Sequence, residues 1–163
     1  MRSNLFALLP TLVAGALLSG TPLLAQDAQS RLWDAAIAGD TLAIRKAVAD
    51  GAKIDSLDTR RNPNGRMALN WAAWHNRVPA IRLLLSLGAP IEAVNRTGFS
   101  ALNHAAEAGS LEAARALLEA GADPGHANQA GFTPAETARE QGNVEVAALV
   151  EATIASRETP AKP

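Results

Sequence analysis

Apolar residues recur along the chain in blocks with a period of 33 residues. The clearest copies hold a pair of adjacent alanines, followed twelve residues later by a pair of adjacent leucines. These pairs are Ala72 and Ala73 with Leu84 and Leu85, and Ala105 and Ala106 with Leu117 and Leu118. Alanines keep one helix thin, so that a neighbour can approach closely, and leucines fill the space between helices. The pattern predicts stacked pairs of short helices, because one copy cannot bury its own apolar face.

Glycine and cap residues mark the ends of these helices. One glycine opens each copy at a tight turn, where a positive φ would strain other residues. Another follows each leucine-bearing helix and predicts a left-handed C-terminal cap. The glycines are Gly65, Gly98 and Gly131 at the turns, and Gly51, Gly88 and Gly121 after the helices. Thr133 and Pro134 supply a hydroxyl cap and a proline at the first helical position, and Ser100 can cap in the same way.

The third copy carries the fullest motif, with Ser100, Leu102 and Asn103 opening its first helix and Gly109 between its helices. The second copy has Asn76 where that turn expects glycine. With these residues the chain resembles the ankyrin-repeat family over residues 30–154. The resemblance implies an all-α ankyrin-repeat solenoid of about four helix–turn–helix units, linked by β-hairpin-like fingers. The approximate units are 30–58, 59–94, 95–127 and 128–154.

The junction between the first two units is longer than the others. The alanine pair of the first unit begins at Ala35, and the spacing from Ala35 to Ala72 is 37 residues instead of 33. Insertions in repeat proteins map to loops. The four extra residues therefore predict a longer first finger, where Asn62, Pro63 and Asn64 shape a turn.

The two ends of the chain differ from the repeats. Arg2, the apolar run 5–18 and the small residues before Ala25 are typical of a secretory signal peptide over residues 1–25. The alternative is an uncleaved membrane anchor. Residues 26–29 would form a short leader, and the polar, proline-rich residues 155–163 predict a disordered tail. Together with an alanine-rich composition, the signal indicates an exported, periplasmic bacterial protein.

Composition narrows the chemistry further. The chain has no cysteine, which excludes thiol nucleophiles and thiolate metal sites. Its three histidines are not paired at helical spacing, and we expect no catalytic residues, no cofactor and no metal. Without Arg2 the formal charge is 14 − 16 = −2, which gives no reason to expect nucleic acid or a membrane as partner. We expect His104 to be buried and hydrogen-bonded to its neighbours.

The resemblance implies that finger tips and the exposed side of the inner helices form one concave face. Trp74 on this face is either an aromatic anchor for a partner or a side chain that packs on Trp71 or the long loop. Arginines of the long finger either pair with carboxylates of a partner or lie in a solvated loop balanced by Asp55 and Asp58. Trp33 and Trp71 are expected to pack in the core. The predicted partner-binding residues are Trp74, His75, Arg60, Arg61, Asn64, Arg66, Arg96, Glu107 and Glu140.

These observations favour a non-enzymatic interaction module, monomeric and periplasmic, that docks one protein partner on its concave face and finger tips. An immunity or inhibitor protein that blocks a secreted toxin or hydrolase is the alternative, and it would use the same surface. The sequence does not distinguish the two, because they differ in the identity of the partner and not in the fold.

Overall fold

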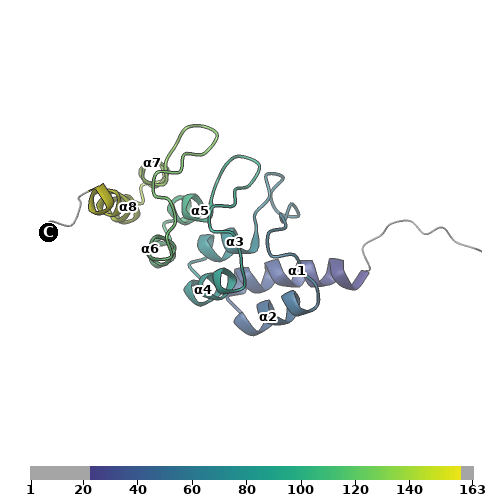
Figure 1. Cartoon of the computed structure of the whole chain (residues 1–163). Helices are drawn as coiled ribbons and strands as arrows, with labels where there is room; N and C mark the ends of the chain where they lie inside the picture. The colour runs from purple at the N-terminus through teal and green to yellow at the C-terminus, as the bar shows by residue number, and fades with distance from the viewer. Residues whose placement is uncertain (1–22, 159–163) are drawn as a thin grey trace, which may run out of the picture.

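The structure is a computed structural model, and it describes residues 23–158. Within this range eight α-helices follow one another as four antiparallel pairs, one pair for each repeat (Figure 1). The helices are α1 (Leu23–Ala38), α2 (Thr41–Ala49), α3 (Ala68–Trp74), α4 (Val78–Ser86), α5 (Ala101–Ala108), α6 (Leu111–Glu119), α7 (Pro134–Glu140) and α8 (Val144–Glu158).

The pairs stack side by side into a solenoid, as predicted. The inner helices α1, α3, α5 and α7 pack in series, and the outer helices α2, α4, α6 and α8 form a second row beneath them (Figure 1). Three fingers project on the side of the inner helices: finger 1 (residues 50–67), finger 2 (87–100) and finger 3 (120–133). Over residues 23–158 the fingers contain no regular strand, and one isolated antiparallel bridge joins Asp58 to Arg66 in finger 1.

Local sequence explains the helix ends. The hydroxyl oxygens of Ser100 and Thr133 accept from backbone N–H groups at the third residues of α5 and α7. Asn76 has φ 55° and takes the left-handed conformation that Gly109 adopts in the next repeat. Its side chain gives a further link, because Asn76 Oδ1 accepts from the N–H of Ala113 at 2.8 Å. The departure from glycine at this turn thus ties the second repeat to the third.

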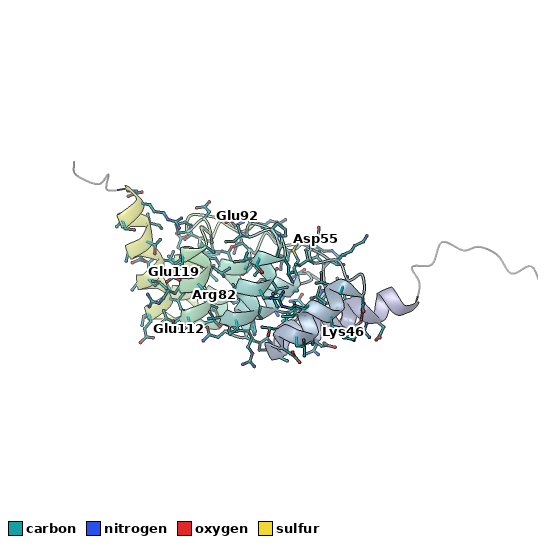
Figure 2. The ribbon with its side chains drawn as sticks, turned by 60° about the horizontal axis from the view of Figure 1, so that its bottom comes forward. Lys46, Asp55, Arg82, Glu92, Glu112 and Glu119 are labelled. Atoms are coloured by element: carbon teal, nitrogen blue, oxygen red, sulfur yellow. The ribbon has the colours of Figure 1, made fainter. Side chains whose placement is uncertain are left out.

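The core follows the predicted pattern of small and large residues. Every member of the alanine pairs Ala72–Ala73 and Ala105–Ala106 is fully buried between inner helices. Leu84 and Leu117 are fully buried in the outer row. Trp33 and Trp71 are also buried, with 8% and 5% of their surface exposed, as predicted. The outer face of the stack carries charges of both signs that point away from it, among them Lys46, Arg82, Glu112 and Glu119 (Figure 2).

The first and last helices run past the predicted bounds of the repeat domain, residues 30 and 154. The predicted leader is helical, because residues 26–29 belong to α1, where Ala28 is fully buried and Gln29 exchanges two hydrogen bonds with Lys53. Residues 155–158 of the predicted tail continue α8, and Arg157 donates to the carbonyl of Leu118 in α6 and to that of Ala122 in finger 3. Residues 1–22, which hold most of the predicted signal peptide, and residues 159–163 lie outside the described part of the chain.

Candidate functional site

The extra residues of the first junction all lie in one stretch of finger 1. Asp58 follows Gly51 by seven residues, as Asn95 follows Gly88 and Asn128 follows Gly121. The N–H of Asn95 bonds to the carbonyl of Phe99, four residues on, whereas the N–H of Asp58 bonds to the carbonyl of Arg66, eight residues on. The insertion therefore lengthens the finger tip and leaves the helices on either side in the repeat register.

Asp58 is the polar centre of finger 1. Its side chain is completely buried, and its two carboxylate oxygens accept four hydrogen bonds. The donors are the backbone N–H, Nε and Nη2 of Arg60, at 2.8–3.0 Å, and Trp71 Nε1 at 3.2 Å. Burial alone would raise the pKa of Asp58, but the hydrogen bonds and the charge of Arg60, with the bond from Trp71, outweigh burial and lower this pKa. Asp58 thus holds the finger to the inner helix α3.

Arg66 occupies the place that phenylalanine takes in the other fingers. It follows Gly65 as Phe99 follows Gly98 and Phe132 follows Gly131. The guanidinium carbon of Arg66 lies 4.8 Å from the ring centroid of Trp71 and 4.0 Å from that of Trp74. Only 11% of the Arg66 side chain is exposed. A cation replaces an aromatic ring here, and two tryptophans supply its favourable surroundings.

His104 lies on α5 beside this stack. Its ring centroid is 6.1 Å from Trp74 and 5.4 Å from Phe99, and 2% of the residue is exposed. The prediction of burial is confirmed, but the predicted hydrogen bonds are absent: neither ring nitrogen has a hydrogen-bond partner in the described residues, although Nδ1 lies 3.4 Å from Glu107 Oε2. Burial lowers the pKa of His104, Glu107 offsets only part of this effect, and the charge of Arg66 adds to it.

Two pockets lie between the fingers and the inner helices. The larger, of about 430 Å³, is lined by residues of all three fingers and of α5. The smaller, of about 160 Å³, lies one repeat further along and shares Phe99 and Glu107 with the first. We call the two together the finger groove. It is lined by Asn62, Asn64, Arg66, Asn95, Thr97, Phe99, His104, Glu107, Asn128, Gln129, Ala130, Phe132, Thr137, Glu140 and Gln141.

The predicted binding residues of the fingers fall into two groups. Asn64 and Arg66 line the finger groove. Arg60, Arg61 and Arg96 lie outside its lining and bond to the protein itself. Arg60 joins Asp58 to Asp34, Arg61 lies 3.4 Å from Asp34, and Arg96 donates to the carbonyl of Pro63 at 2.6 Å. The geometry gives Arg60 a structural task, and its role in binding stays a prediction.

The predicted binding residues on or next to the inner helices also fall into two groups, because Trp74 and His75 lie outside the lining of the finger groove. Glu107 and Glu140 line the finger groove. Trp74 is partly buried, and it packs under Arg66 and against the edge of His104. His75 stacks on Trp71 with ring centroids 6.0 Å apart. Both alternatives for Trp74 stay open, since a side chain that supports Arg66 can also contact a partner.

Sequence reasoning missed the roles of two residues and could have found both. One of the two alternatives for the long finger placed Asp58 in a solvated loop, yet its distance from Gly51 places it at the position of Asn95 and Asn128. His104 was expected to satisfy its ring nitrogens, but it shares the repeat position of Trp71 and Thr137, where the side chain meets a finger. In each case the signal is the repeat register and not the local sequence.

Comparison with family models gives a match to ankyrin repeats (3 copies) over residues 32–128, more than half of the chain. The match begins within α1 and ends in finger 3, and it includes most of the pairs and fingers described above. The chain belongs to the ankyrin-repeat family. A comparison with curated proteins found no matching relative.

Ankyrin repeats generally mediate protein–protein interaction and are non-catalytic modules. In residues 23–158 of this ankyrin-repeat chain, no group of three or more histidine, aspartate or glutamate side chains is placed to hold a metal ion. In the same range, no helix has both the length and the apolar character needed to cross a membrane.

The buried histidine of this ankyrin stack predicts a pH dependence of stability. The pKa of His104 in the folded state lies below its ordinary value of 6.5. As the pH falls through 6.5, the imidazole is therefore protonated in the unfolded chain but stays neutral in the folded chain, which favours unfolding. We expect the free energy of unfolding to be lower at pH 5.5 than at pH 7.5, and His104→Gln to reduce this difference. Urea titrations at the two pH values would measure it.

The reduction should be partial, because His75 contributes in the same direction. Burial and the charges of Arg77, Arg66 and Arg61 lower the pKa of His75. If the wild type and His104→Gln lose equal stability between the two pH values, the neutral, buried state assigned to His104 is wrong.

Proposed function

We propose that this ankyrin-repeat chain is a non-enzymatic docking module that binds one protein partner in the finger groove and on the adjacent finger tips. The observation that carries the proposal is the groove itself, which runs across the second, third and fourth repeats and combines arginine, aromatic and amide side chains. Aromatic and arginine side chains dominate binding energy in protein interfaces. From the signal-like residues at its start, we further propose that the protein acts in the periplasm. We also propose that it acts as a monomer.

The size of the stack supports a single partner. Four repeats offer one concave face, on the order of the 800 Å² that each partner of a standard interface buries. The outer face carries dispersed charges of both signs, which favour contact with water over a second dry interface (Figure 2). A chain of this geometry suits one docked protein better than a multi-component scaffold.

Affinity capture from the native compartment tests the proposal. We expect the wild-type chain to retain one protein, and Trp74→Ala to weaken its binding at least tenfold, because the change removes a large contact beside Arg66. Arg61→Ala tests the tip of finger 1, and it is preferred to a change at Arg60, which holds the buried Asp58. Circular dichroism would establish that each variant is folded.

Arg82→Ala is the matched control, because Arg82 lies on the outer helix α4 with 70% of its side chain exposed. Binding that survives Trp74→Ala and Arg61→Ala but fails with Arg82→Ala would place the interface on the outer face and refute the proposal. If the captured protein is an enzyme whose activity falls on mixing, the inhibitor alternative is the specific form of the function.

A further inference from the structure

The guanidinium group of Arg66 makes no hydrogen bond to another residue in the range 23–158. Stacking on Trp71 and Trp74 fixes the guanidinium plane, which leaves the N–H groups at its edge available for hydrogen bonds. The nearest carboxylate is that of Glu107, and the distance from Arg66 Nη2 to Glu107 Oε2 is 3.9 Å, too long for a hydrogen bond. The Nε atom of Arg66 is buried without a hydrogen-bond partner in the described residues.

The charge of Arg66 is costly in this position. Burial lowers the pKa of Arg66, and the charge of Glu107 opposes this effect. An arginine remains protonated in proteins nonetheless. A buried cation with unused donors is a strong attractor for an anion, because each charge-assisted hydrogen bond gains more than a neutral one.

The rest of the larger pocket favours a ligand rich in acceptors. The amide side chains of Asn64 and Gln129 make no hydrogen bond to other described residues, and both line the pocket. His104 lines it too, 2% exposed and with neither ring nitrogen hydrogen-bonded to another described residue. Among the described residues that line this pocket, Glu107 is the one acid. Arg66 is the one cation among the same described residues, and donor groups that can assist it come from fingers 1 and 3 and from α5.

We infer that the larger pocket of the finger groove binds a carboxylate side chain, aspartate or glutamate, of the protein partner. Arg66 is the counter-ion, and the amides of Asn64 and Gln129 donate to the same group. Glu107 opposes the incoming charge, and so it limits the affinity and disfavours a carboxylate that does not reach Arg66. The inference rests on the proposed function, because it takes the occupant from a docked protein.

The second arginine near the pocket adds to its charge complementarity. Arg96 of finger 2 donates to the carbonyl of Pro63 in finger 1, and it forms no ion pair within residues 23–158. By contrast, the charges of Arg60 and Arg61 are balanced by Asp58 and Asp34. Of the four arginines in fingers 1 and 2, Arg66 at the groove and Arg96 beside it therefore have no carboxylate within hydrogen-bonding distance in residues 23–158. An acidic segment meets favourable potential there.

Short peptides test the inference directly. The probes are acetyl-Gly-Glu-Gly-amide, its glutamine analogue and its lysine analogue, titrated while tryptophan emission is recorded. The chain has no tyrosine, and two of its three tryptophans contact Arg66, so emission reports on the pocket. We expect the glutamate peptide to bind with a Kd on the order of 1 mM, and the other two at least tenfold more weakly. Salt at 0.5 M should weaken the binding of the glutamate peptide, because it screens the attraction between the two charges.

Substitutions separate the charge of the pocket from its fold. Arg66→Gln should raise the Kd of the glutamate peptide at least tenfold. Glu107→Gln should lower this Kd about threefold, because it removes the opposing charge. If Arg66→Gln does not fold, Arg66→Lys replaces it in the test. Lysine keeps the charge without the planar fork of donors, so the affinity for the glutamate peptide should fall by less than the loss predicted for Arg66→Gln. Arg82→Gln, on the outer face, is the matched control and should leave the Kd unchanged.

Equal binding of the glutamate and glutamine peptides, or a preference for the lysine peptide, would overturn the inference. Weaker binding by Glu107→Gln would also overturn it, since Glu107 would then be part of the recognition. If the chain captures a protein through Trp74 but ignores the glutamate peptide, the inference fails and the proposed function stands. If the peptide binds but no protein is captured, the pocket chemistry stands and the proposed function fails.

Discussion

Asp58→Asn is expected to lower the free energy of unfolding by about 3 kcal/mol, within the range for breaking a buried, hydrogen-bonded ion pair. The carboxylate of Asp58 is fully buried and accepts from Arg60 and Trp71 through both oxygens. An asparagine amide keeps one acceptor and places an NH2 group where the second oxygen lies. At least one of the present donors then faces another donor, without water to replace the lost bond.

Urea denaturation of Asp58→Asn and the wild type at pH 7 would measure the loss. Asp55→Asn is the matched control, because Asp55 is exposed in the same finger and should change the free energy of unfolding by less than about 0.5 kcal/mol. If the two variants lose the same amount, Asp58 does not hold the finger.

The difference between Asp58→Asn and the wild type should also depend on pH. The folded-state pKa of Asp58 lies below its ordinary value of 3.8. The carboxylate therefore contributes its full stabilisation above that value, and the contribution is lost as the pH falls through the folded-state pKa. We expect the two proteins to converge in stability in strong acid. A difference that stays constant on acidification would contradict the ionised state of Asp58.

Gly98→Ala is expected to lower the free energy of unfolding by about 3 kcal/mol, of which about 1 comes from the left-handed backbone and the rest from a steric clash. Gly98 has φ 78°, a value that alanine adopts with strain. A Cβ atom at this position would lie 2.8 Å from the backbone nitrogen of Gln129 in finger 3. Backbone cannot rotate away as a side chain can. Relief of the clash must move fingers 2 and 3 apart and strain the hydrogen bond from Gln129 N–H to the carbonyl of Thr97.

Gly131→Ala is the matched control for this prediction. Gly131 occupies the same repeat position with φ 87°, and a Cβ atom there would meet nothing within 4 Å. It should lose only the backbone contribution, about 1 kcal/mol. Urea denaturation of both variants gives the difference of about 2 kcal/mol that the clash predicts. Equal losses would mean that the fingers yield without cost.

Periodicity made the fold predictable and left the site only partly so. A 33-residue repeat fixes which residues face the core, because every unit must bury the same face against its neighbour. It also places Trp74, Glu107 and Glu140 at one repeated position. Both predictions concern the repeat register, which can be read directly from the amino-acid sequence.

Pairing between side chains was the part that sequence did not carry. Arg60 and Arg66 are both arginines of one finger, and the repeat register gives Arg66 the position of Phe99 and Phe132 but does not say what either arginine contacts. Arg60 closes on the buried Asp58, while Arg66 stacks on two tryptophans of α3 and lines the groove. Which arginine does which depends on the path of the finger tip after a four-residue insertion. That path is set by hydrogen bonds between residues that no periodic pattern relates.

The insertion in finger 1 also bears on how such a protein can evolve. Its four residues fall between Asp58 and Gly65, and the helices before and after keep their register. The length and chemistry of a finger can therefore change during evolution without altering how the helices pack in the stack. In this chain the two are coupled at Asp58, where a single carboxylate fastens the lengthened finger to the core. Substitutions at the finger tip can therefore change binding specificity, provided that Asp58 is retained.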